Sequence, residues 1–240
     1  MSEPNTDVQQ RMAIVRETDA VKQLLGRGIG SINKRGSVEV DPYVTLQLIS
    51  QGIERLLKLT VMFQHHREHG EFPSVRGYQH GLNRLSEDVL SKAQQASNSS
   101  EFRVLGEDLD FAANDPTLKT LIHACSTFSS GGRYYDLDVV AGRTLNPEDS
   151  PRIAWEAIET SARADDQALL QQIAALDHDT HEAGLEEINS RITATVQRYI
   201  RFVARLWAFS PTGDIARQFS SSLYVWLTLN DDELRTQHGS

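Results

Sequence analysis

The sequence predicts an all-α protein, an antiparallel helical bundle with an additional group of C-terminal helices. Three observations predict this class. Apolar residues recur at three- and four-residue steps along several long stretches, which is the period of a half-buried helix. No stretch sustains the two-residue alternation of a strand. Short polar residues repeatedly stand before a proline, a combination that begins helices.

The first 40 residues predict one helix followed by a glycine-rich loop. Helical periodicity covers about residues 8–25, and residues 26–37 hold four glycines with Asn33, Lys34 and Arg35. The Gly26-x-Gly28-x-Gly30 run follows no strand and lacks the third glycine spacing of a dinucleotide-binding fingerprint. We therefore expect a flexible loop here, with the N-terminal helix packing against either of the two helical groups that follow.

Residues 41–145 predict the main bundle. Asp41-Pro42 and Asp115-Pro116 each place a capping oxygen before a proline suited to the first helical position. Loops are expected over residues 70–78 and 97–100, and a helix stop at the Ser-Ser-Gly-Gly of residues 129–132.

Residues 150–230 predict a second group of helices that packs on the bundle, and residues 231–240 a tail. Residues 146–150 form the join, and Ser150-Pro151 begins the next helix. The polar stretch 177–182 predicts an interhelical turn with an N-cap. The strongest helical pattern in the chain follows, from Leu185 to Phe209, with one apolar face: Ile188, Ile192, Val196, Tyr199, Val203, Leu206 and Trp207.

Composition bounds the function. The formal net charge of −9 argues against broad, non-specific attraction to nucleic acid or anionic membrane. Cys125 is the only cysteine, so intramolecular disulfides and cysteine-based zinc sites are excluded, and its apolar neighbours predict burial. His65 and His69 share a helix face but lack the glutamate of a metalloprotease motif. We expect no metal, no cofactor, no membrane contact and a cytoplasmic protein.

Charge is segregated near the C-terminus. Residues 143–186 hold ten acidic and three basic residues, whereas residues 187–209 hold four arginines and one glutamate. Those arginines form a stripe beside the apolar face: Arg191, Arg198, Arg201 and Arg205. Such a stripe binds phosphates of a nucleic acid, contacts a partner, or pairs with the acidic segment before it, within one chain or between subunits.

Two parts of the bundle resemble one family. The first is residues 51–58 (QGIERLLK), followed after a Gly-Glu-Phe-Pro loop by residues 77–85 (GYQHGLNRL); the second is residues 133–138 (RYYDLD). Together they resemble the HEPN superfamily of helical bundles, over about residues 42–140. The resemblance implies a homodimer, an RNA, nucleotide or protein partner, and a setting in prokaryotic defence or toxin–antitoxin systems.

Many HEPN proteins are metal-independent ribonucleases that use an Arg-x4-6-His motif for proton transfer and for the phosphate charge. That motif is absent here, since only three residues separate Arg76 from His80. The first hypothesis is therefore a non-catalytic or regulatory HEPN-like protein. The second is a ribonuclease with a non-standard site at His80, Arg133 and Arg76, although His80 and Arg133 also fit structural roles. The third is a helical assembly module without a ligand.

Overall fold

Helices make up the protein in a computed structural model that describes residues 4–34, 42–78, 81–97, 105–164, 166–209 and 211–234. No strand occurs within these ranges, so the predicted all-α class is confirmed. The α-helices are α1 (Pro4–Asn33), α2 (Pro42–His69), α3 (Leu82–Ser97), α4 (Gly106–Asn114), α5 (Pro116–Ser130), α6 (Tyr135–Val140), α7 (Pro151–Arg163), α8 (Gln167–Ile173), α9 (His178–Ala208), α10 (Asp214–Phe219) and α11 (Tyr224–Leu227). Short 3-10 turns join several of them: η1 (Val75–Tyr78), η3 (Gly132–Tyr134), η4 (Pro147–Asp149), η5 (Ser220–Leu223) and η6 (Asp231–Glu233).

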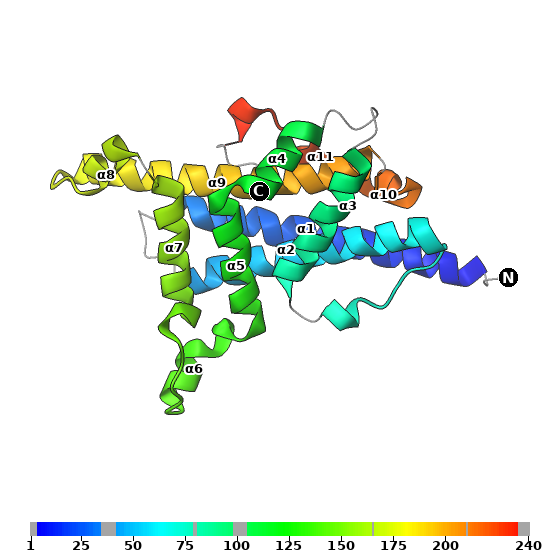
Figure 1. Cartoon of the computed structure of the whole chain (residues 1–240), viewed down its shortest axis with the longest axis horizontal. Coiled ribbons are helices and arrows are strands. Elements are labelled where there is room, and N and C mark those ends of the chain that lie inside the picture. The colour runs from blue at the N-terminus through cyan, green and yellow to red at the C-terminus, as the bar shows by residue number, and fades with distance from the viewer. Residues whose placement is uncertain are drawn as a thin grey trace.

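The three longest helices lie side by side along the long axis of the molecule (Figure 1). Helix α1 runs opposite to α2 and α9, and it contacts both of them. Helices α5 and α7 cross this layer steeply, and α6 lies at the far end of the projection that they begin. The N-terminal helix thus packs against both helical groups, and not against only one.

The expected loop from Gly26 is wrong as far as Asn33, because α1 continues through its glycines. Close packing explains why glycines stand inside this helix. A Cβ atom on Gly28 would lie 2.5 Å from Ile49 Cδ1, and one on Gly52 of α2 would lie 2.6 Å from Leu25 Cδ2. The glycines let α1 and α2 approach closely, so they serve helix packing and not a flexible turn.

Several predicted helix ends are confirmed. The Asp115 carboxylate accepts a hydrogen bond of 2.7 Å from the backbone N–H of Leu118, and the Asp177 carboxylate accepts one of 3.0 Å from Thr180. Each satisfies a backbone donor that the first turn of a helix leaves without a partner. Helix α5 ends at Ser130, before Gly131, as its Ser-Ser-Gly-Gly sequence predicts.

One continuous hydrophobic core joins α1, α2, the crossing helices and α9. The predicted apolar face of α9 is buried, including Tyr199 and Trp207. Trp207 donates its indole N–H to the Thr60 hydroxyl on α2 at 2.9 Å, so the polar atom of this buried ring has a partner. Across the described ranges, no helix has both the length and the apolar composition needed to cross a membrane.

Candidate functional site

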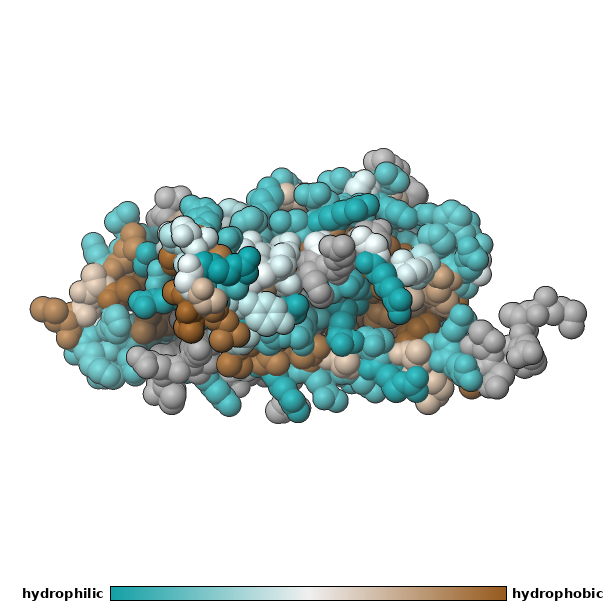
Figure 2. Space-filling model, turned by 90° about the horizontal axis from the view of Figure 1, so that it is seen from below, coloured by the Kyte–Doolittle hydropathy of each residue, from teal (hydrophilic) through white to brown (hydrophobic). Residues whose placement is uncertain are grey.

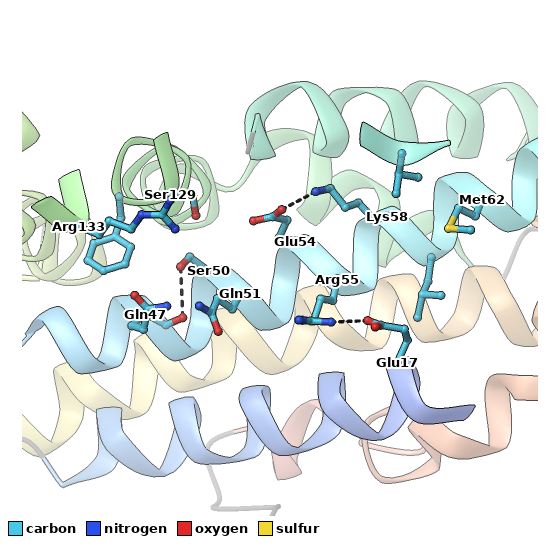
Figure 3. Close-up of a pocket in the computed structure, with 13 residues that line it drawn as sticks. Glu17, Gln47, Ser50, Gln51, Glu54, Arg55, Lys58, Met62, Ser129 and Arg133 are labelled. Carbon is cyan, nitrogen blue, oxygen red and sulfur yellow. Dashed lines mark hydrogen bonds and ion pairs between the residues drawn. The ribbon is translucent and has the colours of Figure 1, made fainter. Parts of the chain in front are cut away.

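A cleft of about 480 Å³ opens along α2, between α1 on one side and the end of α5 on the other. Helix α2 forms most of it with one polar face, η1 contributes an apolar side chain, and η3 contributes an arginine (Figure 3). The lining residues are Glu17, Gln47, Ser50, Gln51, Glu54, Arg55, Lys58, Leu59, Met62, Val75, Phe128, Ser129 and Arg133.

Four charged side chains of the cleft form two ion pairs. Lys58 Nζ lies 2.5 Å from Glu54 Oε1, as the i,i+4 spacing on α2 predicts. Arg55 Nη1 lies 2.5 Å from Glu17 Oε2 and so ties α2 to α1. These pairs neutralise one another, and they fix the positions of four groups along the cleft.

Arg133 is the third cation of the cleft, and neither of these two ion pairs includes it. Its guanidinium lies 5.0 Å from the centre of the Tyr134 ring, a cation–π contact. Its buried Nε has no hydrogen-bond partner, and within the described ranges it forms no ion pair. Asp138, five residues after Arg133, pairs with Arg143 at 2.8 Å. Because Arg133 has no carboxylate partner in the described ranges, its guanidinium is available to an anionic ligand.

Neutral polar side chains face the same cleft. Gln47, Ser50 and Gln51 stand on neighbouring turns of α2, and Ser129 stands on the last turn of α5 (Figure 3). The Ser50 hydroxyl lies 3.4 Å from the Gln47 carbonyl, a long contact that a ligand can replace at little cost. Leu59, Met62, Val75 and Phe128 supply apolar surface. The cleft thus combines one available cation, several hydrogen-bonding groups and an apolar wall.

Two segments that carry the HEPN resemblance meet at this cleft. Gln51, Glu54 and Lys58 come from the first of them, and Arg133 comes from the last. Of the two predicted catalytic residues that the structure describes, Arg133 lines the cleft and Arg76 does not. Arg76 is exposed on η1, next to the cleft residue Val75, and His80 lies outside the described residues.

The predicted arginine stripe on α9 is mostly turned toward carboxylates of the same chain. Asp108, only 1% exposed, accepts hydrogen bonds from Arg201 Nη2 at 2.7 Å and from Arg205 Nη1 at 2.6 Å. Arg201, 3% exposed, also lies 2.7 Å from Asp231. Burial opposes its charge, but the hydrogen bonds to Asp108 and Asp231 outweigh burial and raise its pKa. We call Arg201, Arg205, Asp108 and Asp231 the buried ion cluster.

The other two arginines of the stripe differ from these. Arg191 pairs with Glu187 at 2.8 Å and with Asp166 at 2.6 Å, which is one contact with the acidic segment that precedes α9. Arg198 lies 4.5 Å from the centre of the Phe111 ring, with its Nε 3.6 Å from Asp108. Of the four arginines, only Arg191 thus contacts the described part of the acidic segment that the sequence offered as a partner, whereas the other three lie against Asp108, which is outside that segment.

The remaining candidates do not form a site. His65 and His69 stack with ring centres 4.1 Å apart, and within the described ranges no group of three or more metal-ligating side chains converges. Cys125 is buried, as predicted, and burial raises the pKa of its thiol to about 12. A thiol held protonated in this way is a poor nucleophile.

Sequence reasoning missed most of the cleft, although one signal for it was present. Gln47, Gln51, Glu54 and Lys58 follow one another at steps of four, three and four residues, so they form a polar stripe on a helix that is otherwise largely buried. No such signal existed for Glu17, because only the fold brings α1 alongside α2.

Comparisons with protein-family models, with curated proteins and with solved structures found no match for this chain.

Proposed function

We propose that this chain is a non-catalytic, HEPN-like helical protein that binds a nucleoside monophosphate in the α2 cleft. The observation that carries the proposal is Arg133, whose guanidinium faces the cleft without a carboxylate partner in the described part of the chain. A guanidinium presents two parallel N–H donors that match the oxygens of a phosphate.

Charge supports a monophosphate over a longer phosphate chain. The cleft holds three cations, Arg55, Lys58 and Arg133, and two carboxylates, Glu17 and Glu54, so its formal charge is +1. Two of the cations are already paired, and only one is left for the ligand. A triphosphate or an RNA strand would bring several negative charges to this single cation, and the net charge of −9 would oppose its approach.

Size and composition support a nucleoside as the remainder of the ligand. The volume of about 480 Å³ lies within the range of ~300–1,000 Å³ that small-molecule sites occupy. Gln47 and Gln51 each offer an amide, which both donates and accepts hydrogen bonds. Met62 and Phe128 supply apolar surface for a planar base.

Calorimetric titration of the purified protein with AMP, GMP, CMP and UMP tests this proposal. We expect one of the four to bind, and Arg133→Ala to weaken that binding by ~10-fold to 100-fold, because a charge-assisted hydrogen bond contributes ~1.5–3 kcal/mol. Arg152→Ala is the matched control, since Arg152 is exposed on α7 and lies outside the cleft. No binding of any monophosphate, or equal loss in both variants, would contradict the proposal.

The second hypothesis, a ribonuclease, draws support from Arg133, which lines the cleft, whereas its candidate base His80 lies outside the described residues. Labelled RNAs incubated with the protein in EDTA test it. Cleavage by the wild type that is lost in folded His80→Ala and Arg133→Ala variants would establish a metal-independent nuclease. That result would make the non-catalytic proposal wrong.

A further inference from the structure

Beside the cleft, the chain forms a projection that we call the arm, residues 134–149, which contains α6 and the turn after it. None of its residues is buried, and the last buried residue before the arm is Gly132. Figure 1 shows α6 at the end of this projection, away from the three long helices. The arm thus gains little from packing on its own chain.

Apolar side chains nevertheless gather on the arm. Tyr134, Leu137, Val139 and Val140 are all at least half exposed, and Leu137 and Val140 are 67% and 85% exposed. Figure 2 views the molecule from the side on which the arm projects, and apolar surface lies there among polar side chains. Several large apolar side chains exposed on one short element are typical of a surface that a partner covers.

The charges of the arm and the cleft are opposite. The arm carries four acidic residues, Asp136, Asp138, Glu148 and Asp149, against the single base Arg143, a formal charge of −3. The cleft carries +1, with Arg133 available at its edge and an apolar wall behind it. An acidic and apolar element therefore complements a cationic and apolar cleft of the same protein.

The arm cannot fold back into its own cleft without moving, because it begins at that cleft's edge. Phe128, Ser129 and Arg133 line the cleft, and the arm starts at the next residue. A projection that stands directly beside a complementary hollow is suited to reciprocal exchange across a two-fold axis, because the same patch then serves both subunits.

We propose that two copies of this chain form a dimer in which the arm of each lies in the α2 cleft of the other. Leu137 and Val140 contact the apolar wall of the partner's cleft, and Asp136 faces the partner's Arg133. A second copy is the occupant that the opposite charges and the adjacency of arm and cleft favour. The nucleotide and the arm then compete for one cleft. This competition rests on the proposed function, whereas dimer formation is independent of it.

The first test measures molar mass by light scattering over a range of protein concentrations. We expect a dimer that dissociates on dilution, and we expect Leu137→Asp to shift its dissociation constant by at least ~10-fold, since a buried leucine contributes ~1.5–3 kcal/mol. Leu176→Asp is the matched control, because Leu176 is fully exposed on the turn before α9, outside both arm and cleft. A monomer at every concentration, or equal effects of the two variants, would overturn the proposal.

The second test distinguishes arm-to-cleft exchange from other dimers. Val140→Cys and Gln51→Cys variants are prepared separately, mixed and oxidised mildly; the native Cys125 thiol, buried with a pKa of about 12, stays unreactive. Arm exchange predicts a disulfide between the two different chains. A disulfide only between two Val140→Cys chains would show arm-to-arm contact, and no disulfide in a dimeric mixture would place the interface elsewhere; either result contradicts the exchange.

Failure of this inference is separable from failure of the proposed function. Leu137→Asp leaves every cleft residue in place, so its titration with the four monophosphates reports nucleotide binding without the arm. Binding by a protein that never dimerises would reject the exchange and keep the nucleotide site. Dimerisation without nucleotide binding would reject the nucleotide site and keep the arm exchange.

Discussion

Arg133 and Arg201 show how differently one residue type is used in this molecule. Arg201 is 3% exposed and lies within 2.7 Å of both Asp108 and Asp231. Arg133 is partly buried beside an open cleft, stacks on Tyr134 and forms no ion pair in the described ranges, although the Nε atoms of both arginines lack a hydrogen-bond partner. The buried ion cluster balances two arginines with two carboxylates, whereas the cleft holds three cations against two carboxylates and leaves one cation for a ligand.

The number of nearby carboxylates, and not the number of arginines, therefore decides which cation is available to a ligand. In the buried ion cluster, Asp108 accepts from two arginines and holds α4 against α9. At the cleft, Arg55 and Lys58 are paired, and Asp138, five residues after Arg133, pairs with Arg143. We therefore assign stability to the first region and ligand binding to the second.

The largest expected effect is on stability, from Asp108→Ala. This change leaves Arg201 buried with only the exposed Asp231 as its acidic partner, so we expect a loss of ~3–5 kcal/mol in the free energy of unfolding. Urea denaturation followed by circular dichroism measures it. Asp214→Ala is the control, because its pair with Arg217 is exposed and contributes less than ~1 kcal/mol. A loss below ~1 kcal/mol for Asp108→Ala would remove the distinction between the two regions.

Arginine-to-alanine changes in the two regions should affect different properties. We expect Arg201→Ala to lower the free energy of unfolding by ~2–3 kcal/mol, because charged hydrogen bonds to Asp108 and Asp231 are lost. Arg133→Ala should change it by no more than ~0.5 kcal/mol, because the side chain forms no ion pair in the described structure. The same urea titrations decide this, and comparable losses in both variants would contradict the comparison.

A smaller effect is expected on the pH dependence of stability. The hydrogen bond from Arg201 holds the pKa of Asp231 below its usual value. A carboxyl with a lowered pKa in the folded state stabilises above its unfolded pKa of ~3.9, and that contribution is lost as the pH falls through the folded value. Because Asp231 is 62% exposed, solvent screening keeps the contribution below ~1 kcal/mol.

Asp231→Asn should therefore lose less stability between neutral pH and pH ~3 than the wild type does. Thermal or urea unfolding across this range measures the difference. The neighbouring Asp232→Asn changes charge equally and serves as the control. A steeper acid loss in Asp231→Asn than in the wild type would have the wrong sign for a carboxyl with a lowered pKa.

Local patterns predicted the helices well because each helix is specified by nearby residues. Asp115 and Asp177 cap the helices that they precede, and the period of the apolar residues marks the buried face of α9. The stretch from Gly26 was misjudged because a glycine in the sequence indicates a turn and a close helix contact equally well. Only the approach of Ile49 to Gly28 decides between them.

The cleft was less predictable, because its residues come from elements that are distant in sequence. Arg133 is a candidate from the sequence alone, but nothing local brings Glu17 to Arg55. The partners of the arginine stripe were unpredictable for the same reason. Arg201 pairs with Asp108, which is 93 residues away in the sequence, and the spacing of the arginines does not predict that partner.

The most direct test of the account observes the arginine side chains themselves. In an NMR spectrum of the Nε–Hε groups of the 15N-labelled protein, assigned with Arg133→Lys and Arg201→Lys variants, we add the monophosphate that binds most tightly. The account predicts that the Arg133 signal shifts in proportion to occupancy while the Arg201 signal stays in place. A shift of Arg201 with Arg133 unchanged would contradict it, because the ligand would then bind at the arginines that we assign to stability.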